Sequence, residues 1–439
     1  PGADVLVTLS DDVSITFDEV TTAGNTTLET SHIGSEPPNN FVVHPPSAPM
    51  YYDINTTASY SGLIHLKINY DDTEIDTEIE DDLRIFKYIE SNSEWLGITT
   101  SVDIENNFIY GNTDHLSIYA IMFQIGGAGE SGLIVTNCDD SGPGSLRDAI
   151  LYANSNPGPD TIRFQIPKGV PGYDPDIGVW IIAPQSVLPS ITDVGLIIDG
   201  FSQREFIGED SNPHGPEIWL NGELAGQYAH GLRSTAASTD IVGLTISNFQ
   251  NAGITMDGVD GGRISGCYVG VDFGGNAPAA NGYGIWVGNN TRNVAITPSD
   301  TFKNVISGNT NGGVIVADTS SHVVILGNII GLNRTGMYAI GNGNYGGIRI
   351  DYQCDSVEVV DNWIGGNKFG IYVISSHNIT IGNNFIGSNR INDEIIELGN
   401  EADGISLTEG ARDNVIIENF IRFNGANGVY ITGTNTIHN

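Results

Sequence analysis

A four-residue element in the second half of the chain constrains the fold more than any other feature of the sequence. Each copy consists of glycine, an apolar residue, a variable residue and a second apolar residue, and successive copies start 31, 29, 34, 23, 34 and 24 residues apart. The copies begin at Gly253, Gly284, Gly313, Gly347, Gly370, Gly404 and Gly428. Coils of about 22–24 residues with occasional insertions explain this spacing, and periods of this size indicate a solenoid.

The alternation inside each Gly element predicts β-strands rather than helices. A second recurring element ends in asparagine, at Asn328, Asn362, Asn384 and Asn419. Asparagine tolerates left-handed turns and stacks amide on amide, so these residues are expected to form a ladder at a turn, with Cys267 in the same slot. Because parallel crossovers are nearly always right-handed, the sequence predicts an all-β fold with a right-handed parallel β-helix.

Residues 133–230 are expected to form the N-terminal cap of the β-helix and its first irregular coils. Ser145 is a good N-cap with Asp148 three residues later, and an apolar stripe follows, which predicts a helix over 145–154. Such a helix covers the open end of a solenoid. Residues 231–439 carry the regular repeats and stop where a further repeat would follow, so we expect a piece of a longer protein, truncated at its C-terminus.

Residues 1–125 are expected to form a small, acidic β-sandwich-like module, joined to the β-helix by a Gly-rich linker over 126–132. Alternating runs at 13–17, 63–68, 83–88 and 118–122 are separated by turn-rich stretches. The chain has 17 Lys and Arg against 53 Asp and Glu, a net charge of −36. That charge repels nucleic acid, and no apolar run is long enough to span a membrane.

The segment Thr136–Asn154 contains Asp-Ser-Gly-Pro-Gly-Ser-Leu-Arg-Asp-Ala-Ile. It resembles the cap of many bacterial and archaeal secreted surface proteins with parallel β-helix repeats, and the Gly- and Asn-rich loops at 270–284 and 331–346 are similar to loops of the same group. The resemblance covers about 133–439, and residues 1–125 resemble acidic β-modules that accompany such proteins. It implies a secreted or cell-surface location and a structural or adhesion role.

The residue at +2 of each Gly element should face outward, whereas +1 and +3 should face inward. Stacking then aligns these +2 residues in one outward column: Thr255, Trp286, Ile315, Arg349, Tyr372, Ser406 and Tyr430. Rings pack on sugar faces and polar groups bond to hydroxyls, so we expect the candidate polysaccharide-binding residues on one exposed face to be Trp286, Arg349, Asp351, Tyr372 and Tyr430. The alternative is a strand surface that simply favours β-forming side chains.

A polysaccharide lyase, glycoside hydrolase or epimerase is the rival to a binding protein. Hydrolysis needs clustered carboxylates, and lyase or epimerase chemistry needs a base with calcium-binding acids nearby. The repeats contain no such series, and Asp210–His214, which is similar to an epimerase Asp-Pro-His element, lies before the regular coils. Catalytic residues are therefore not identified, and the partner is expected to be a polysaccharide or a neighbouring surface protein.

Calcium is the one cofactor for which the sequence offers a candidate site. The acidic run at 70–82 supplies the oxygen ligands that calcium prefers, and its candidate ligands are Asp71, Asp72, Asp76, Asp81 and Asp82. The run lacks the spacing and the glycine of an EF-hand, so a solvated loop is the alternative. The three cysteines, Cys138, Cys267 and Cys354, have no metal-type spacing and define no disulfide framework.

Overall fold

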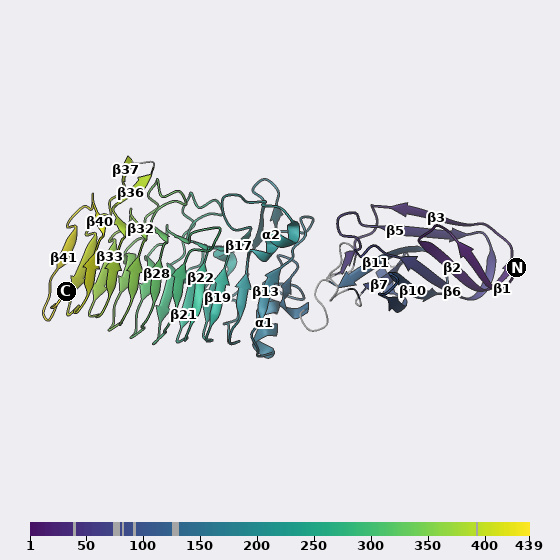
Figure 1. Cartoon of the computed structure of the whole chain (residues 1–439), viewed down its shortest axis with the longest axis horizontal. Coiled ribbons are helices and arrows are strands. Elements are labelled where there is room, and N and C mark those ends of the chain that lie inside the picture. The colour runs from purple at the N-terminus through teal and green to yellow at the C-terminus, as the bar shows by residue number, and fades with distance from the viewer. Residues whose placement is uncertain (38–40, 73–79, 81–82, 91–93, 125–130, 392–393) are drawn as a thin grey trace. The chain divides into compact units, whose positions relative to one another are not determined.

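The computed structural model divides into two compact units, Pro1–Ser131 and Gly132–Asn439 (Figure 1). It describes residues 1–37, 41–72, 80, 83–90, 94–124, 131–391 and 394–439. The second unit is the solenoid, and its strands follow one another along the stack in Figure 1.

The first unit is a β-sandwich of two antiparallel sheets that share one apolar core. All four strands expected from the sequence lie inside observed strands. One sheet contains β1 (Gly2–Thr8), β2 (Val13–Thr22), β6 (Ser59–Asn69), β10 (Phe108–Thr113) and β9 (Thr99–Asp103). The other contains β3 (Thr26–Ser31), β5 (Tyr51–Thr56), β11 (Ile118–Gln124), β7 (Leu83–Ile89) and β8 (Glu94–Gly97), with β4 (Phe41–Val43) paired to β11. The sandwich prediction is confirmed.

The second unit is a right-handed parallel β-helix built from three sheets, as predicted. Sheet 1 contains β12 (Ile134–Val135), β13 (Thr161–Phe164), β16 (Ile197–Asp199), β19 (Thr239–Val242), β22 (Gly262–Ser265), β25 (Ala295–Thr297), β28 (Val324–Leu326), β31 (Glu358–Val360), β34 (Thr380–Gly382) and β39 (Val415–Ile417). Sheet 2 contains β14 (Tyr173–Asp174), β15 (Val179–Ile182), β17 (Ile218–Asn221), β20 (Leu244–Ser247), β23 (Tyr268–Val269), β26 (Val305–Ile306), β29 (Ile329–Ile330), β32 (Trp363–Ile364), β35 (Phe385–Ile386) and β40 (Phe420–Ile421). Sheet 3 contains β18 (Leu232–Ser234), β21 (Ala252–Asp257), β24 (Tyr283–Gly288), β27 (Gly312–Val316), β30 (Gly346–Ile350), β33 (Ile371–Ile374), β38 (Ile405–Thr408) and β41 (Val429–Ile431).

Seven strands of sheet 3, β21 to β41, are the Gly elements, and their +1 residues stack in register inside the solenoid. The column is Ile254, Ile285, Val314, Ile348, Ile371, Ile405 and Val429. The first six are fully buried, as predicted, and burying each contributes about 1.5–3 kcal/mol. Val429 is 42% exposed, contrary to the prediction, because the described chain stacks a coil on only one side of it.

Two ladders of buried asparagines fix the corners between the sheets. The predicted ladder runs from Asn328 through Asn362 and Asn384 to Asn419, and Asn304 extends it by one rung, with side-chain amides 2.8–3.0 Å apart. Cys267 occupies the slot before it, and its backbone N–H donates to the Asn304 side chain at 2.7 Å. A second ladder, which the sequence analysis missed, is formed by Asn281, Asn309, Asn342, Asn367, Asn400 and Asn424.

The N-terminal end of the solenoid is covered by helix α1 (Leu146–Ser155), beside β13 in Figure 1. Ser145 is its N-cap and accepts a hydrogen bond from the Asp148 backbone N–H, and the predicted apolar stripe is buried in the β-helix core. The remaining elements are α2 (Ser202–Ile207), two 3-10 turns (Ser131–Leu133 and Gly222–Leu224) and the hairpin of β36 (Ser388–Ile391) and β37 (Glu394–Glu397). Among the described residues, neither helix is long and apolar enough to cross a membrane.

Candidate functional site: a groove along sheet 3

The outward column predicted from the sequence is aligned on sheet 3. Each +2 residue pairs in register with the next, from Thr255 through Trp286, Ile315, Arg349, Tyr372 and Ser406 to Tyr430. The alignment follows from parallel, in-register stacking, which places each strand position beside its counterpart in the next coil.

The exposure of the column differs from the prediction of one exposed face. Thr255, Ile315 and Ser406 are buried, with 2–4% of their surface accessible, whereas Trp286 and Arg349 are half-buried. Large side chains lean over the small ones between them, because neighbouring coils are only about 4.8 Å apart. The column is therefore not one evenly exposed face.

A hollow of about 350 Å³ lies over β18, β21 and β24. Tyr283 and Trp286 line one part of it. The other lining residues are polar: His230, Arg233, Asn251, Thr255, Asp257 and Asn289. Its volume reaches the lower end of the range for ligand pockets, about 300–1,000 Å³, and the mixture of rings and convergent polar groups is typical of such pockets.

A narrower hollow of about 80 Å³ continues along the sheet over β24, β27 and β30. It shares Tyr283 and Trp286 with the first hollow and is further lined by Ile315, Tyr345, Arg349, Asp351 and Tyr352. Because the two hollows share these rings, they adjoin each other along the sheet, and we call the pair the sheet 3 groove. The wider hollow has room for a ligand, and the narrower one extends its surface along the helix axis.

Three aromatic rings form the centre of the groove. Tyr283 and Trp286 meet edge to face with ring centroids 5.3 Å apart, and Tyr283 stacks on Tyr345 at 6.0 Å and 12°. Sequence reasoning missed Tyr283, because strict alternation assigns the residue before each glycine to the interior. A Cβ at Gly284 would lie 2.4 Å from the backbone oxygen of Gly313 and 2.8 Å from the buried Ile306, so Gly284 faces the interior as Ile285 does, and the alternation breaks there.

Arg349 and Asp351 form an ion pair at the far end of the groove. The Arg349 Nε donates to an Asp351 carboxylate oxygen at 2.6 Å, and its guanidinium lies over the rings of Tyr345 at 4.8 Å and Tyr372 at 5.5 Å. Asp351 was expected on the exposed face, but it is only 4% exposed because it lies beneath this arginine. Burial raises the pKa of Asp351 although the bond from Arg349 lowers it.

A second charged pair lies in the wider hollow. Arg233 Nε donates to Asp257 at 3.0 Å, its Nη2 forms a closer bond to the same oxygen, and Asn289 donates to the other oxygen. Burial alone raises the pKa of Asp257, but the bonds from Arg233 and Asn289 outweigh it and hold that pKa below its usual value. Asp257 is therefore a fixed anion.

His230 lies beside this pair, and both of its ring nitrogens have partners. Its Nδ1 is 2.7 Å from the Thr255 hydroxyl, and its Nε2 is 3.0 Å from the Asn251 amide nitrogen. Burial and the nearby Arg233 lower the pKa of His230, so the ring is uncharged near neutral pH. His230 and Arg233 precede the first Gly element that the sequence analysis recognised. Gly231-Leu232-Arg233 is a degenerate copy 22 residues before Gly253, and it places Arg233 beside Thr255 in the outward column, so this copy was the signal that could have found Arg233.

Of the five predicted binding residues, the structure brings three together. Trp286, Arg349 and Asp351 line the groove, and the ring of Tyr372 packs against Arg349 and stacks on Phe369 at 5.2 Å. Tyr430 lies two strands beyond Tyr372, is 41% exposed and lines neither hollow. Its role in binding is not supported by its position.

The calcium candidates are only partly described. Asp71 and Asp72 are exposed, whereas Asp76, Asp81 and Asp82 lie outside the described residues. Within the ranges that the structure describes, no group of three or more His, Cys, Asp or Glu side chains is placed to hold a metal ion.

The three cysteines are free thiols. Cys267 and Cys354 are fully buried. Burial raises the pKa of Cys267 to about 11 and those of Cys138 and Cys354 to about 12. Because the thiolate is the reactive form, the raised pKa values make these thiols poor nucleophiles.

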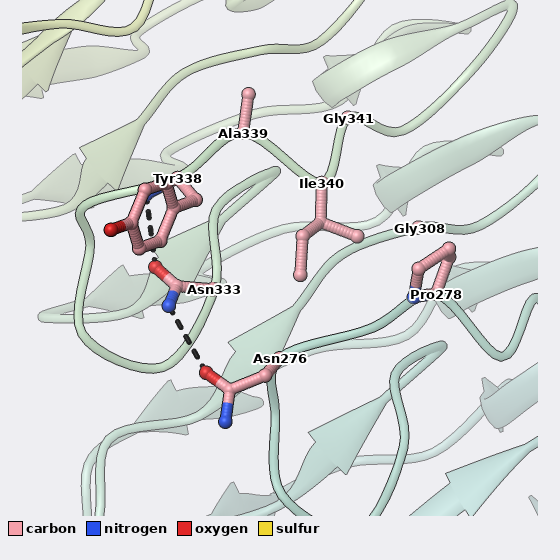
Figure 2. A pocket seen from close by; sticks show the side chains of 8 residues that line it. All are labelled: Asn276, Pro278, Gly308, Asn333, Tyr338, Ala339, Ile340 and Gly341. Carbon is pink, nitrogen blue, oxygen red and sulfur yellow. Dashed lines mark hydrogen bonds between the residues drawn. The ribbon is translucent and has the colours of Figure 1, made fainter.

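A further hollow of about 480 Å³ lies between two similar loops, 270–281 and 331–342 (Figure 2). The Asn333 side chain donates a hydrogen bond to the Asn276 side chain at 3.1 Å and accepts one from the Tyr338 backbone N–H. The side chains of Asn276 and Asn333, which line the hollow, are therefore bonded to each other. No charged side chain lines it among the described residues. Nearby, Asp210 pairs with Arg204 and His214 contacts Arg334, which gives the Asp210–His214 element a structural role.

No family model matches the chain, and no curated protein matches it. Among solved structures it is similar to the periplasmic alginate epimerase AlgG, at 17% identity over 57% of this chain and a TM-score of 0.32. That match spans only 58% of the AlgG chain. The A-module of the Azotobacter vinelandii mannuronan C-5 epimerase AlgE4 matches at 14% identity and a TM-score of 0.32. That match covers 70% of this chain and 98% of the A-module. PfbA, a surface adhesin of Streptococcus pneumoniae, matches at 12% identity and a TM-score of 0.32. That match covers 69% of this chain and 90% of the PfbA chain. The fold assignment rests on the strand pairing of this chain.

Proposed function

We propose that this protein is a secreted or cell-surface structural or adhesion protein that binds a polysaccharide along the sheet 3 groove. The observation that carries the proposal is that the two hollows adjoin each other at Tyr283 and Trp286. Aromatic faces and hydrogen-bonding groups then follow one another along the surface, as binding of an extended chain requires.

A linear polymer suits this site because the groove runs across successive strands, from β18 to β30. Neighbouring coils stack along the axis of the solenoid, with their strands about 4.8 Å apart, so a groove that crosses successive strands runs along this axis. Sugar rings that pack on Trp286 and Tyr283 would have neighbours in the same polymer beside Arg233 on one side and Arg349 on the other.

The surface location is supported by the composition and by the cap. A net charge of −36 keeps the chain solvated and repels nucleic acid. The segment Thr136–Asn154 resembles the cap of secreted surface proteins, and this resemblance supports the same location. A neighbouring surface protein is the alternative partner for the groove.

Binding without catalysis fits the state of the titratable groups. A general acid or base must be free to exchange a proton with the substrate. Both nitrogens of His230 are engaged, Asp257 is held ionised, and Asp351 lies beneath Arg349. The rival function, a polysaccharide lyase, hydrolase or epimerase, would need one of these three groups, or one of the groove's tyrosines, as its acid or base.

Binding should be tested on an array of purified polysaccharides with the wild type and the Tyr283→Ala/Trp286→Ala double variant. Loss of two stacking rings should weaken binding more than tenfold, because each ring contributes about 0.5–1.5 kcal/mol beyond its buried area. Tyr430→Ala is the matched control, since it removes an exposed ring of the same column outside the groove. Equal binding by the wild type and the folded double variant would contradict the proposal.

The same polysaccharides should be incubated with the wild type and analysed for unsaturated ends, new reducing ends and altered sugar configuration. We expect no change in any polymer that the array retains. A reaction that disappears in His230→Asn would instead support the enzyme.

A further inference from the structure

Every charged group that lines the sheet 3 groove has a counter-charge in contact with it. Arg233 is paired with Asp257, and Arg349 is paired with Asp351. These four are the only ionised side chains that line the groove within the described ranges, because burial keeps His230 uncharged near neutral pH. The groove is therefore polar but has no net charge.

The surroundings add negative charge. Asp318 lies close enough to Asp351 to raise the pKa of that carboxyl. Over the whole chain, acidic side chains outnumber basic ones by 53 to 17. An acidic polymer that approaches the groove therefore meets repulsion at long range and no unpaired cation on arrival.

The uncommitted hydrogen-bonding groups suit hydroxyls. Within the described part of the chain, the Trp286 indole N–H and the terminal nitrogens of Arg349 donate to no protein group, and the side-chain oxygens of Asn251 and Asn289 accept from none. A sugar hydroxyl donates and accepts, so it can use both kinds of group. A carboxylate only accepts, so where it replaces a hydroxyl it cannot donate to an amide oxygen.

From this arrangement we infer that the groove selects an uncharged polysaccharide and discriminates against uronic-acid polymers. The inference rests on the proposed function and names its ligand class. Its physical basis is that binding a carboxylate strips water from a charge, whereas the charge of each arginine in the groove is already balanced by an aspartate. The groove would then discriminate by making the binding free energy of the charged polymer less favourable rather than by adding contacts to the neutral one.

Matched pairs of polymers test the inference, because they share one backbone and differ only in charge. The pairs are a β-glucan, a mannan and a galactan, each with its counterpart that carries a carboxylate at C6. Retention on the immobilised polymers should be at least tenfold stronger for the neutral member of any pair that is bound.

The outcomes separate the inference from the proposed function. If a C6-carboxylate polymer binds as tightly as its neutral counterpart or more tightly, and Tyr283→Ala/Trp286→Ala abolishes this binding, glycan binding stands and the inference is wrong. If neither member of any pair nor any other polysaccharide of the array is retained, the proposed function fails, and the inference fails with it.

A charge variant provides an independent test. Asp257→Asn keeps the shape of the side chain but leaves Arg233 without its counter-charge, so the ratio of acidic to neutral binding should rise at least fivefold. Asp351→Asn should act in the same way through Arg349 and serves if the first variant is unstable. Asp240→Asn is the control, because Asp240 pairs with Arg263 at 3.3 Å between two strands of sheet 1, away from the groove. A ratio that stays at the wild-type value in both folded groove variants would overturn the inference.

Discussion

Truncation of Asn362 to alanine should destabilise the β-helix strongly, because this buried side chain is the middle rung of the first asparagine ladder. Its Oδ1 accepts from the backbone N–H and the side chain of Asn328, at 2.9 and 3.0 Å. Its Nδ2 contacts the carbonyl oxygens of Ile325 and Val360 and the side chain of Asn384, at 2.8, 2.9 and 3.0 Å. The amide has two hydrogens, so these contacts amount to about four full hydrogen bonds.

At about 1 kcal/mol net for each bond, the free energy of unfolding should fall by about 4 kcal/mol. For a unit of this size, about 2 °C is lost per kcal/mol, so the melting temperature should fall by about 8 °C. The measurement is thermal unfolding of the full chain, followed by circular dichroism.

Asn344→Ala is the matched control. Its exposed amide donates one bond, to Asn311 at 3.2 Å, so the melting temperature should change by about 1 °C or less. If Asn362→Ala melts within about 1 °C of the wild type, the ladder contributes nothing, and the account of how the corners are held is wrong.

Three further predictions concern the core, the thiols and the groove. Ile371→Asp should yield no folded protein, because a charge would lie unpaired in a fully buried apolar column, and a soluble variant with a cooperative melting transition would show the register to be wrong. Cys267 and Cys354 should resist a thiol reagent at pH 8 in the native state and react in denaturant, since burial raises their pKa values to about 11 and about 12; rapid native labelling would contradict their burial. In the folded protein the pKa of His230 is below its unfolded value of 6.5, so the neutral ring stabilises the fold above pH 6.5 and this contribution is lost as the pH falls below 6.5. The His230→Gln variant should therefore lose less stability than the wild type between pH 7 and pH 5. Identical profiles of stability against pH for the two proteins would refute this.

The architecture could be predicted from the sequence because every repeat contains the same pattern of apolar and polar residues. Seven Gly elements give the strand period, and the +1 and +2 columns observed on sheet 3 follow from alternation and stacking alone. Ser145 and the apolar residues after it predicted the capping helix from local rules for helix starts, which do not depend on the rest of the fold.

The groove could be predicted only in part, because its shape depends on contacts between coils. The register placed Trp286 and Arg349 correctly, but whether a side chain stands out or leans over its neighbour is decided by packing, as buried Ile315 and Asp351 show. Tyr283 was missed because Gly284 and Ile285 both face the interior, which breaks the alternation. Arg233 was missed because its copy of the Gly element ends in Ser234 rather than in an apolar residue. The second asparagine ladder was missed because inserted loops of unequal length hide its spacing.

The measurement that tests the central claim most directly is a crystal structure of the protein with a hexasaccharide of whichever polymer the array retains. We predict that sugar rings pack on Tyr283 and Trp286 in the wider hollow and that the chain continues along sheet 3 towards Arg349. A hexasaccharide bound between the loops 270–281 and 331–342, or anywhere else that leaves the sheet 3 groove empty, would contradict the account.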